Sequence, residues 1–320
     1  MHKIEIKEII RNEWQNEEVV LVCFDVVGTT KNFLEQEPFY FSLENADLLF
    51  FWGKSTYKEL ITEFDVVDSR PVFQISGVED IESNESAFLW IFLKPENPDN
   101  DGEIFHEINS IMGSLFTYHG EGISYRKRFI NHVKQGKIIN HSELIKNPLS
   151  FFRQPDFSKD GRNFTQHLFN SLSKCEDREK EILKLAFGRI YRGILLSGID
   201  GLLFIWIALE TFAIKGGTNI KPIKSILSQI YDQSSVHISN LEKIYSLRSS
   251  IVHEGYNVPI CHVLVEYLAC ICSDIIHKNL NIPCLKQAEA FLQKKACEIN
   301  QEIDKFLDWK KKNKGECGRT

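Results

Sequence analysis

The sequence predicts an α+β protein in two parts, a β-rich N-terminal domain followed by an all-α helical bundle. Residues 19–27 form a continuous apolar run with many β-branched side chains, which is typical of a buried strand. Proline, aspartate and glycine interrupt any regular pattern between residues 148 and 161. Beyond that stretch, apolar side chains recur at the three-and-four spacing of amphipathic helices.

We therefore expect a β-rich α+β or mostly β domain over residues 1–147, whose topology the sequence does not define, a linker over 148–161 and a helical domain over 162–320. In the first domain, further short strands are expected at 38–43, 47–52, 72–78 and 87–93, and a helix at 104–115. In the second, helices are expected at 178–194, 200–214, 220–231, 236–252, 259–280 and 283–311, with a solvated tail from residue 310.

Composition limits the class of protein. The chain has 320 residues, of which 43% are hydrophobic and 26% charged, as in a soluble protein of about two domains. A net charge of −6 argues against a broad surface for nucleic acid, so an RNA site would have to be a local cationic cleft. Charges at Asp200 and Glu210 interrupt the apolar run 194–213, which predicts a buried core helix rather than a membrane span. Eight cysteines without a C-x-x-C pair favour reduced thiols and a cytoplasmic location.

An arginine interrupts the apolar face of the helix expected at 236–252. That face carries Leu241, Ile244, Tyr245, Ile251 and Val252, with Arg248 among them. A guanidinium in such a place needs a partner or a cleft, because its desolvation is costly. His253 follows five residues later, about 140° around the helix, just before the glycine at 255 that should end it. Both side chains can serve one site only if the imidazole leans back or a second subunit completes the site.

This stretch, L-R-S-S-I-V-H-E-G over residues 247–255, resembles the R-x4-6-H motif of HEPN domains and is most similar to the Apea-like branch of that superfamily. Upstream, W-I-A-L-E over residues 206–210 resembles the apolar helix ending in A-L-E that such domains carry. The resemblance covers roughly the C-terminal half. It implies a HEPN-like helical bundle, often a homodimer, that acts as a metal-independent endoribonuclease in toxin, antiviral defence or abortive-infection systems.

The resemblance also implies roles for individual residues. Arg248 would bind phosphoryl oxygens, and His253 would transfer protons, since an imidazole ordinarily titrates near pH ~6.5. Glu210 would orient one of these two groups or serve as a buried partner. Ser249 and Tyr245 are supporting candidates, as phosphate contacts or as helix surface and core. No cofactor or metal is implied; the expected partners are RNA, with tRNA one candidate, and an unknown trigger or ligand at the N-terminal domain.

Tyr256 is the last supporting candidate. It resembles the tyrosine of HEPN toxins that a partner enzyme adenylylates. In those toxins the tyrosine lies two residues after the histidine, whereas here it lies three residues after His253.

The arginine-histidine spacing occurs three times, at Arg248–His253, at Arg162–His167 and at Arg126–His132. We favour the first pair because it alone lies on an apolar helical face with the flanking residues of the family. A non-catalytic HEPN module that binds RNA, nucleotide or a protein partner is the alternative, since serine rather than asparagine follows the arginine.

Two other patterns in the sequence resemble catalytic or metal sites. The strand that ends in Asp25-Val-Val-Gly-Thr resembles the first motif of haloacid-dehalogenase phosphatases and the opening strand of class III nucleotide cyclases. Neither second carboxylate is present, so a strand followed by a glycine turn is favoured over a magnesium site. A cluster of thiols and imidazoles lacks the spacing of zinc sites and is expected to pack in the core: Cys261, His262, Cys270, Cys272 and His277.

Overall fold

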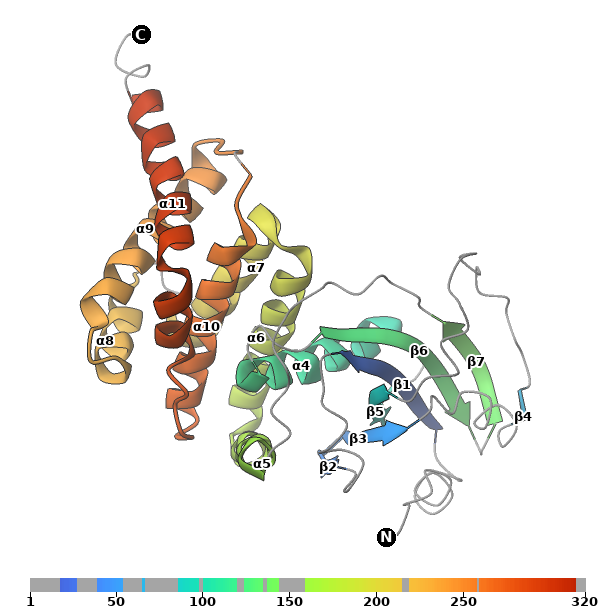
Figure 1. Cartoon of the computed structure of the whole chain (residues 1–320). Helices are drawn as coiled ribbons and strands as arrows, with labels where there is room; N and C mark the ends of the chain where they lie inside the picture. Colours follow the sequence, from blue (N-terminus) through green and yellow to red (C-terminus); the bar gives the residue numbers. More distant parts are fainter. Residues whose placement is uncertain are drawn as a thin grey trace. The chain divides into compact units, whose positions relative to one another are not determined.

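A computed structural model of the chain describes residues 18–27, 39–53, 65–66, 86–97, 100–119, 124–134, 137–143, 159–214, 219–257 and 259–314. The chain divides into two compact units (Figure 1). Unit 1 comprises residues 1–105 and 121–169, and unit 2 comprises residues 106–120 and 170–320. The expected fold class is confirmed, because an antiparallel sheet in the N-terminal part is followed by a mostly helical region.

Unit 1 is built on one sheet with the strand order β2-β3-β5-β1-β6-β7-β4. Its strands are β1 (Glu18–Val27), β2 (Phe39–Ser42), β3 (Ala46–Gly53), β4 (Asp65–Val66), β5 (Ser86–Leu93), β6 (Ser124–Lys134) and β7 (Lys137–Glu143). All neighbouring strands pair antiparallel except the two-residue β4, which runs parallel to β7. The predicted strand at 19–27 is confirmed as β1, which lies between β5 and β6 with residues 19–24 buried. Burial on both faces explains why residues 19–24 are apolar without alternation.

One helix adds to the core of unit 1. Helix α5 (Lys159–Ser173) buries Phe164, Leu168 and Phe169. The ring of Phe169 meets Phe41 of β2 edge-on, with 5.4 Å between the ring centroids.

Unit 2 consists of helices packed around α10. Its helices are α4 (Asp101–His119, from residue 106 on), α6 (Asp177–Leu196), α7 (Gly198–Leu209) with the π-helix η3 (Glu210–Ile214), α8 (Lys221–Ile230), α9 (Ser234–His253), α10 (His262–Asn279) and α11 (Gln287–Lys314). In α10 every residue from 263 to 277 is buried except Glu266. A helix that is buried on nearly all sides is the centre of a bundle.

The apolar run 194–213 is not a single core helix: it contains the end of α6 and then α7 with η3, which confirms the expected separate helices at 178–194 and 200–214. The chain leaves α6 after Leu196, turns at Ser197 and enters α7. The turn is tight because α6 and α7 approach each other through glycines: a Cβ on Gly201 would lie 2.5 Å from the carbonyl oxygen of Gly193. Within the described ranges, no helix combines the length and the apolarity needed to cross a bilayer.

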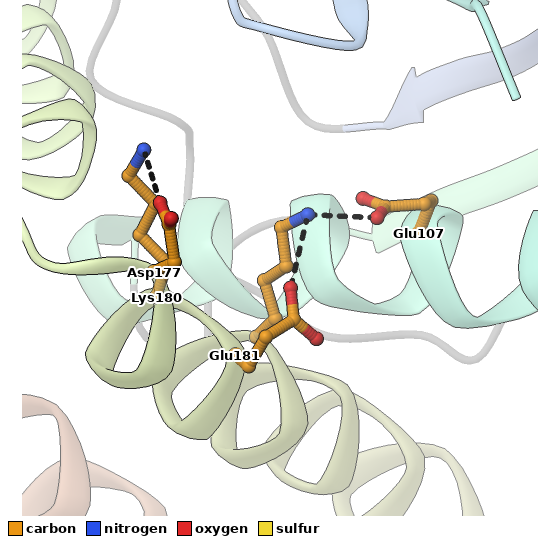
Figure 2. Close-up of polar contacts among 5 residues, drawn as sticks. Glu107, Asp177, Lys180 and Glu181 are labelled. Carbon is orange, nitrogen blue, oxygen red and sulfur yellow. Dashed lines mark hydrogen bonds and ion pairs between the residues drawn. The ribbon is translucent and has the colours of Figure 1, made fainter. Parts of the chain in front are cut away.

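Helices α4 and α6 are also in close contact inside unit 2. A Cβ on Gly113 of α4 would lie 1.9 Å from the carbonyl oxygen of Phe187, so only glycine fits there. Lys184 of α6 bridges the two helices, with its Nζ 2.8 Å from Glu107 Oε1. Figure 2 shows Glu107 facing the charged edge of α6, where Glu181 and the Asp177–Lys180 pair lie.

Several predicted ends differ from the structure. Helix α10 begins at residue 262 rather than 259, because Cys261 is still extended. Helix α11 continues to Lys314, so Lys310 is helical and not part of a tail. The expected strand at 72–78 lies outside the described residues.

Candidate functional site

The arginine and the histidine of the favoured pair lie on one regular helix, α9. Arg248 lies on the same face of α9 as the buried side chains, and its side chain is 24% exposed. His253 is the last residue of the helix and is exposed. The helix ends as expected at the glycine: the amides of Glu254 and Tyr256 both donate to the carbonyl oxygen of Ser250, and Gly255 has φ 72°. The expected apolar face is correct for Leu241 and Ile244 but wrong for Val252, which is 49% exposed. Leu247 is buried instead, because the face of α9 that packs against the core is centred closer to Leu247 than the sequence pattern predicted.

Glu210 is the partner of the arginine. Its Oε1 lies 3.4 Å from Arg248 Nη2 and also accepts a hydrogen bond of 2.8 Å from Trp206 Nε1. The ring of Trp206 in turn lies 5.6 Å from that of Tyr245, which is on α9. Glu210 opens the π-helix η3, and π-helical turns inside α-helices are frequent at functional sites. The pair is half-buried, with each side chain 24% exposed, so the guanidinium remains open to solvent on one side.

Arg248 and His253 do not converge within one chain. Five residues of regular helix separate them by about 140° and about 7.5 Å along the axis. The carboxylate next to the histidine is engaged locally, since Ser250 Oγ donates to Glu254 Oε2 at 3.0 Å. A reacting group held by both side chains would therefore require a second copy of the helix.

A lysine that the sequence reasoning missed lies on the histidine's side of α9. Lys310 Nζ of α11 donates to Ser246 Oγ at 2.8 Å and lies 4.0 Å from Glu254 Oε1. Ser246 and His253 are seven residues apart, so they share a face to within about 20°. The run of lysines at 310–312 begins about one turn after Phe306, the last buried residue of α11 in the described chain, and this run was the signal that could have found the cation.

The supporting candidates divide into surface and core. Ser249 and Tyr245 are half-buried on α9. Tyr256 is 4% exposed and packs edge-on against the rings of Phe306 and Trp309, and burial raises the pKa of its hydroxyl. A hydroxyl in this position takes part in packing and is poorly placed for modification.

The other two arginine-histidine pairs lie outside α9, one on α5 and the other on β6. His167 is exposed on α5, and the side chain of Arg162 lies outside the described residues. Arg126 and His132 lie on β6, and Asp25 on β1; the side chains of these three are likewise outside the described part.

The expected core cluster of thiols and imidazoles is only partly buried: Cys261 is exposed and His262 is 22% exposed, so the expectation was wrong for these two residues. Cys270, Cys272 and His277 are all buried, and burial lowers the pKa of His277 to about 3. In the part of the chain that the structure describes, no three His, Cys, Asp or Glu side chains gather so as to hold a metal ion.

The fold and this site define a two-unit α+β protein whose helical unit carries a half-buried arginine-glutamate pair beside an exposed histidine. No protein-family model, no curated protein and no solved structure matches the chain.

Proposed function

We propose that the chain is a metal-independent endoribonuclease of the HEPN type. The observation that carries the proposal is the arrangement around the end of α9. A half-exposed guanidinium is held by Glu210, an exposed imidazole ends the helix, and Lys310 lies on the imidazole's face. These groups supply the proton transfer and the positive charge that cleavage of a phosphodiester requires.

The chemistry follows from the groups present. The 2′-hydroxyl of the RNA attacks the adjacent phosphorus while an imidazole takes its proton, and the bond from phosphorus to the 5′-oxygen breaks as a second imidazole donates a proton to that oxygen. Arg248 offers two parallel N–H donors to the phosphoryl oxygens, and Lys310 adds a point charge. The products are a 2′,3′-cyclic phosphate and a 5′-hydroxyl.

A homodimer would complete the site. Within one chain His253 and Arg248 face different directions, so a two-fold axis near the end of α9 would bring the histidine of each protomer to the arginine of the other. It would also supply one imidazole as base and one as acid.

The biological role proposed with this activity is that of a toxin or antiviral effector in the cytoplasm. That role rests on the resemblance of residues 247–255 and 206–210 to Apea-like HEPN domains. The N-terminal unit would receive the trigger, and tRNA is one candidate substrate.

The test is cleavage of tRNA and mixed RNA by the purified protein in EDTA. We expect cleavage by the wild type and a loss of at least about 100-fold in His253→Ala and in Arg248→Ala. His167→Ala is the matched control, because it removes an exposed histidine from the competing pair, and its activity should be unchanged. Equal cleavage by wild type and His253→Ala would refute the assignment.

A non-catalytic module that binds RNA, nucleotide or a protein partner is the second candidate. It is favoured by the neutralisation of Arg248 by Glu210 and by the divergence of Arg248 and His253 in one chain. Binding of RNA without any product, unchanged in His253→Ala, would support this alternative.

A further inference from the structure

A serine, a histidine and a glutamate are connected in unit 2 at the end of α7 opposite to Glu210. Ser197 Oγ lies 2.8 Å from His262 Nδ1, and His262 Nε2 lies 2.7 Å from Glu266 Oε1. The serine belongs to the turn between α6 and α7, whereas the other two are one helical turn apart on α10. Twelve residues of α7 separate Ser197 from Glu210, or about 18 Å, so this cluster is independent of the proposed ribonuclease site.

Ser197 is held in a backbone conformation that suits glycine alone. Its φ is 57° and its ψ is −174°, and the next residue, Gly198, has φ 58°. Two backbone hydrogen bonds hold this conformation: the amide of Ser197 donates to the carbonyl oxygen of Gly193 at 3.0 Å, and the carbonyl oxygen of Ser197 accepts from the amide of Gly201 at 2.8 Å. A strained serine that the fold retains is a reason to ask what its hydroxyl does.

The hydroxyl is directed at the imidazole rather than at the helix. Serine at the N-terminal boundary of a helix usually accepts a hydrogen bond from the amides of the first turn. The Ser197 side chain makes no such bond within the described residues. The Glu266 carboxylate oxygen lies 2.7 Å from His262 Nε2 as an ion-pair contact without the alignment of a hydrogen bond, and its negative charge favours the proton on Nε2. Nδ1 is then the acceptor for the serine O–H. The hydroxyl therefore has a general base in contact with it.

The cluster is partly exposed, although the His262 Nε2 atom itself is buried. The side chains of His262 and Glu266 are 22% and 13% exposed, and Ser197 is half-buried. A Cβ built on Gly198 meets no described atom within 4 Å, so the space beside the serine is open. Leu195 and Leu196, which directly precede the serine, are exposed apolar side chains.

We propose that Ser197, His262 and Glu266 form an esterase site for esters with an apolar acyl group. Ser197 Oγ attacks the carbonyl carbon and gives its proton to His262 Nδ1. The bond from that carbon to the alcohol oxygen breaks, and the alcohol leaves with the proton. Water then attacks the acyl-serine, again with His262 as base, and releases the carboxylic acid and the free serine. The balance is ester plus water to acid plus alcohol.

The remaining parts of the mechanism have their places in the same turn. Ser197 directly precedes α7, so the first amides of that helix and the positive end of its dipole lie next to the serine that would be acylated. Glu266 is a positioning residue, because it acts through the imidazole. The two ring nitrogens are used in the opposite order from chymotrypsin-like triads, which is chemically permitted because either nitrogen can carry the lone pair.

The test is reaction of the full-length protein with a fluorophosphonate, which modifies base-activated serines, and hydrolysis of p-nitrophenyl octanoate. We expect modification at Ser197, mapped by mass spectrometry. This modification should be lost in Ser197→Ala and in Ser197→Gly. The glycine variant removes the backbone strain at residue 197 and should keep the fold. His262→Gln should slow modification by at least about 100-fold. Ser228→Ala, which removes an exposed hydroxyl on α8, and His253→Ala should react like the wild type.

Glu266→Gln separates positioning from a purely structural role. We expect kcat for the ester to fall by at least about 10-fold with KM nearly unchanged, because the carboxylate acts when the imidazole becomes charged. Failure of the folded wild type to react at Ser197, or equal hydrolysis by Ser197→Gly, would overturn the proposal while leaving the ribonuclease assay unaffected.

Discussion

Substitution of Ser197 by glycine and by alanine isolates the strain in the turn between α6 and α7. Both variants lose the hydrogen bond to His262, worth about 1 kcal/mol, so that loss cancels in the comparison. Alanine keeps a Cβ at φ 57° and ψ −174°, which costs about 1–3 kcal/mol. Glycine removes this cost but loses about 0.4–1 kcal/mol through the greater freedom of the unfolded chain. We expect Ser197→Gly to be more stable than Ser197→Ala by about 1–2 kcal/mol.

The assay is urea unfolding followed by circular dichroism at 222 nm, which reports mainly on the helices of unit 2. The matched control is the same pair of substitutions at Ser228 inside α8, where glycine should be less stable than alanine by about 1 kcal/mol. The order of the two variants is therefore reversed between the two positions. Should glycine also be the less stable member at residue 197, the inference of backbone strain is refuted.

Three further predictions concern unit 2. The Asp274 carboxylate accepts hydrogen bonds from the Tyr231 hydroxyl and from two backbone amides at the start of α11. The substitution Asp274→Asn turns an N–H₂ group toward one of these donors, so we expect urea titrations to show a free energy of unfolding lower by about 2–3 kcal/mol. Burial lowers the pKa of His237 to about 4, so the unfolded chain binds more protons between pH ~6.5 and ~4, and His237 should remove about 2 kcal/mol of stability as the pH falls to 5. In His237→Gln the fall in stability should be smaller by that amount but not absent, because the buried His277 still contributes, and an unchanged profile would contradict the assignment. A double-mutant cycle of Glu210→Ala and Arg248→Ala should give a coupling free energy of about 0.5–1 kcal/mol, and a coupling that does not shrink in 1 M NaCl would contradict a half-exposed ion pair.

Strands and helices with strong apolar patterns could be predicted from the sequence. The buried strand β1 and the helices α8 and α9 follow predicted ranges to within two residues, because a continuous apolar run and a 3.6-residue periodicity of apolar side chains are local properties of the chain. Strands β6 and β7 were not named individually, since charged and amide side chains interrupt their apolar residues. Their pairing with β1 and with each other is what makes them strands, and pairing is not visible in one segment.

The sequence alone established the two-part α+β organisation, the end of α9 at its glycine and the position of an arginine on an apolar helical face. It also suggested the partner of that arginine, Glu210, which the structure places 3.4 Å away. Lys310 reaches α9 only because α11 packs beside it, and Ser197 meets His262 only because α6, α7 and α10 fold together. Contacts between residues 64 or 65 positions apart depend on helix packing and on a backbone dihedral angle, and neither leaves a periodic signal in the chain.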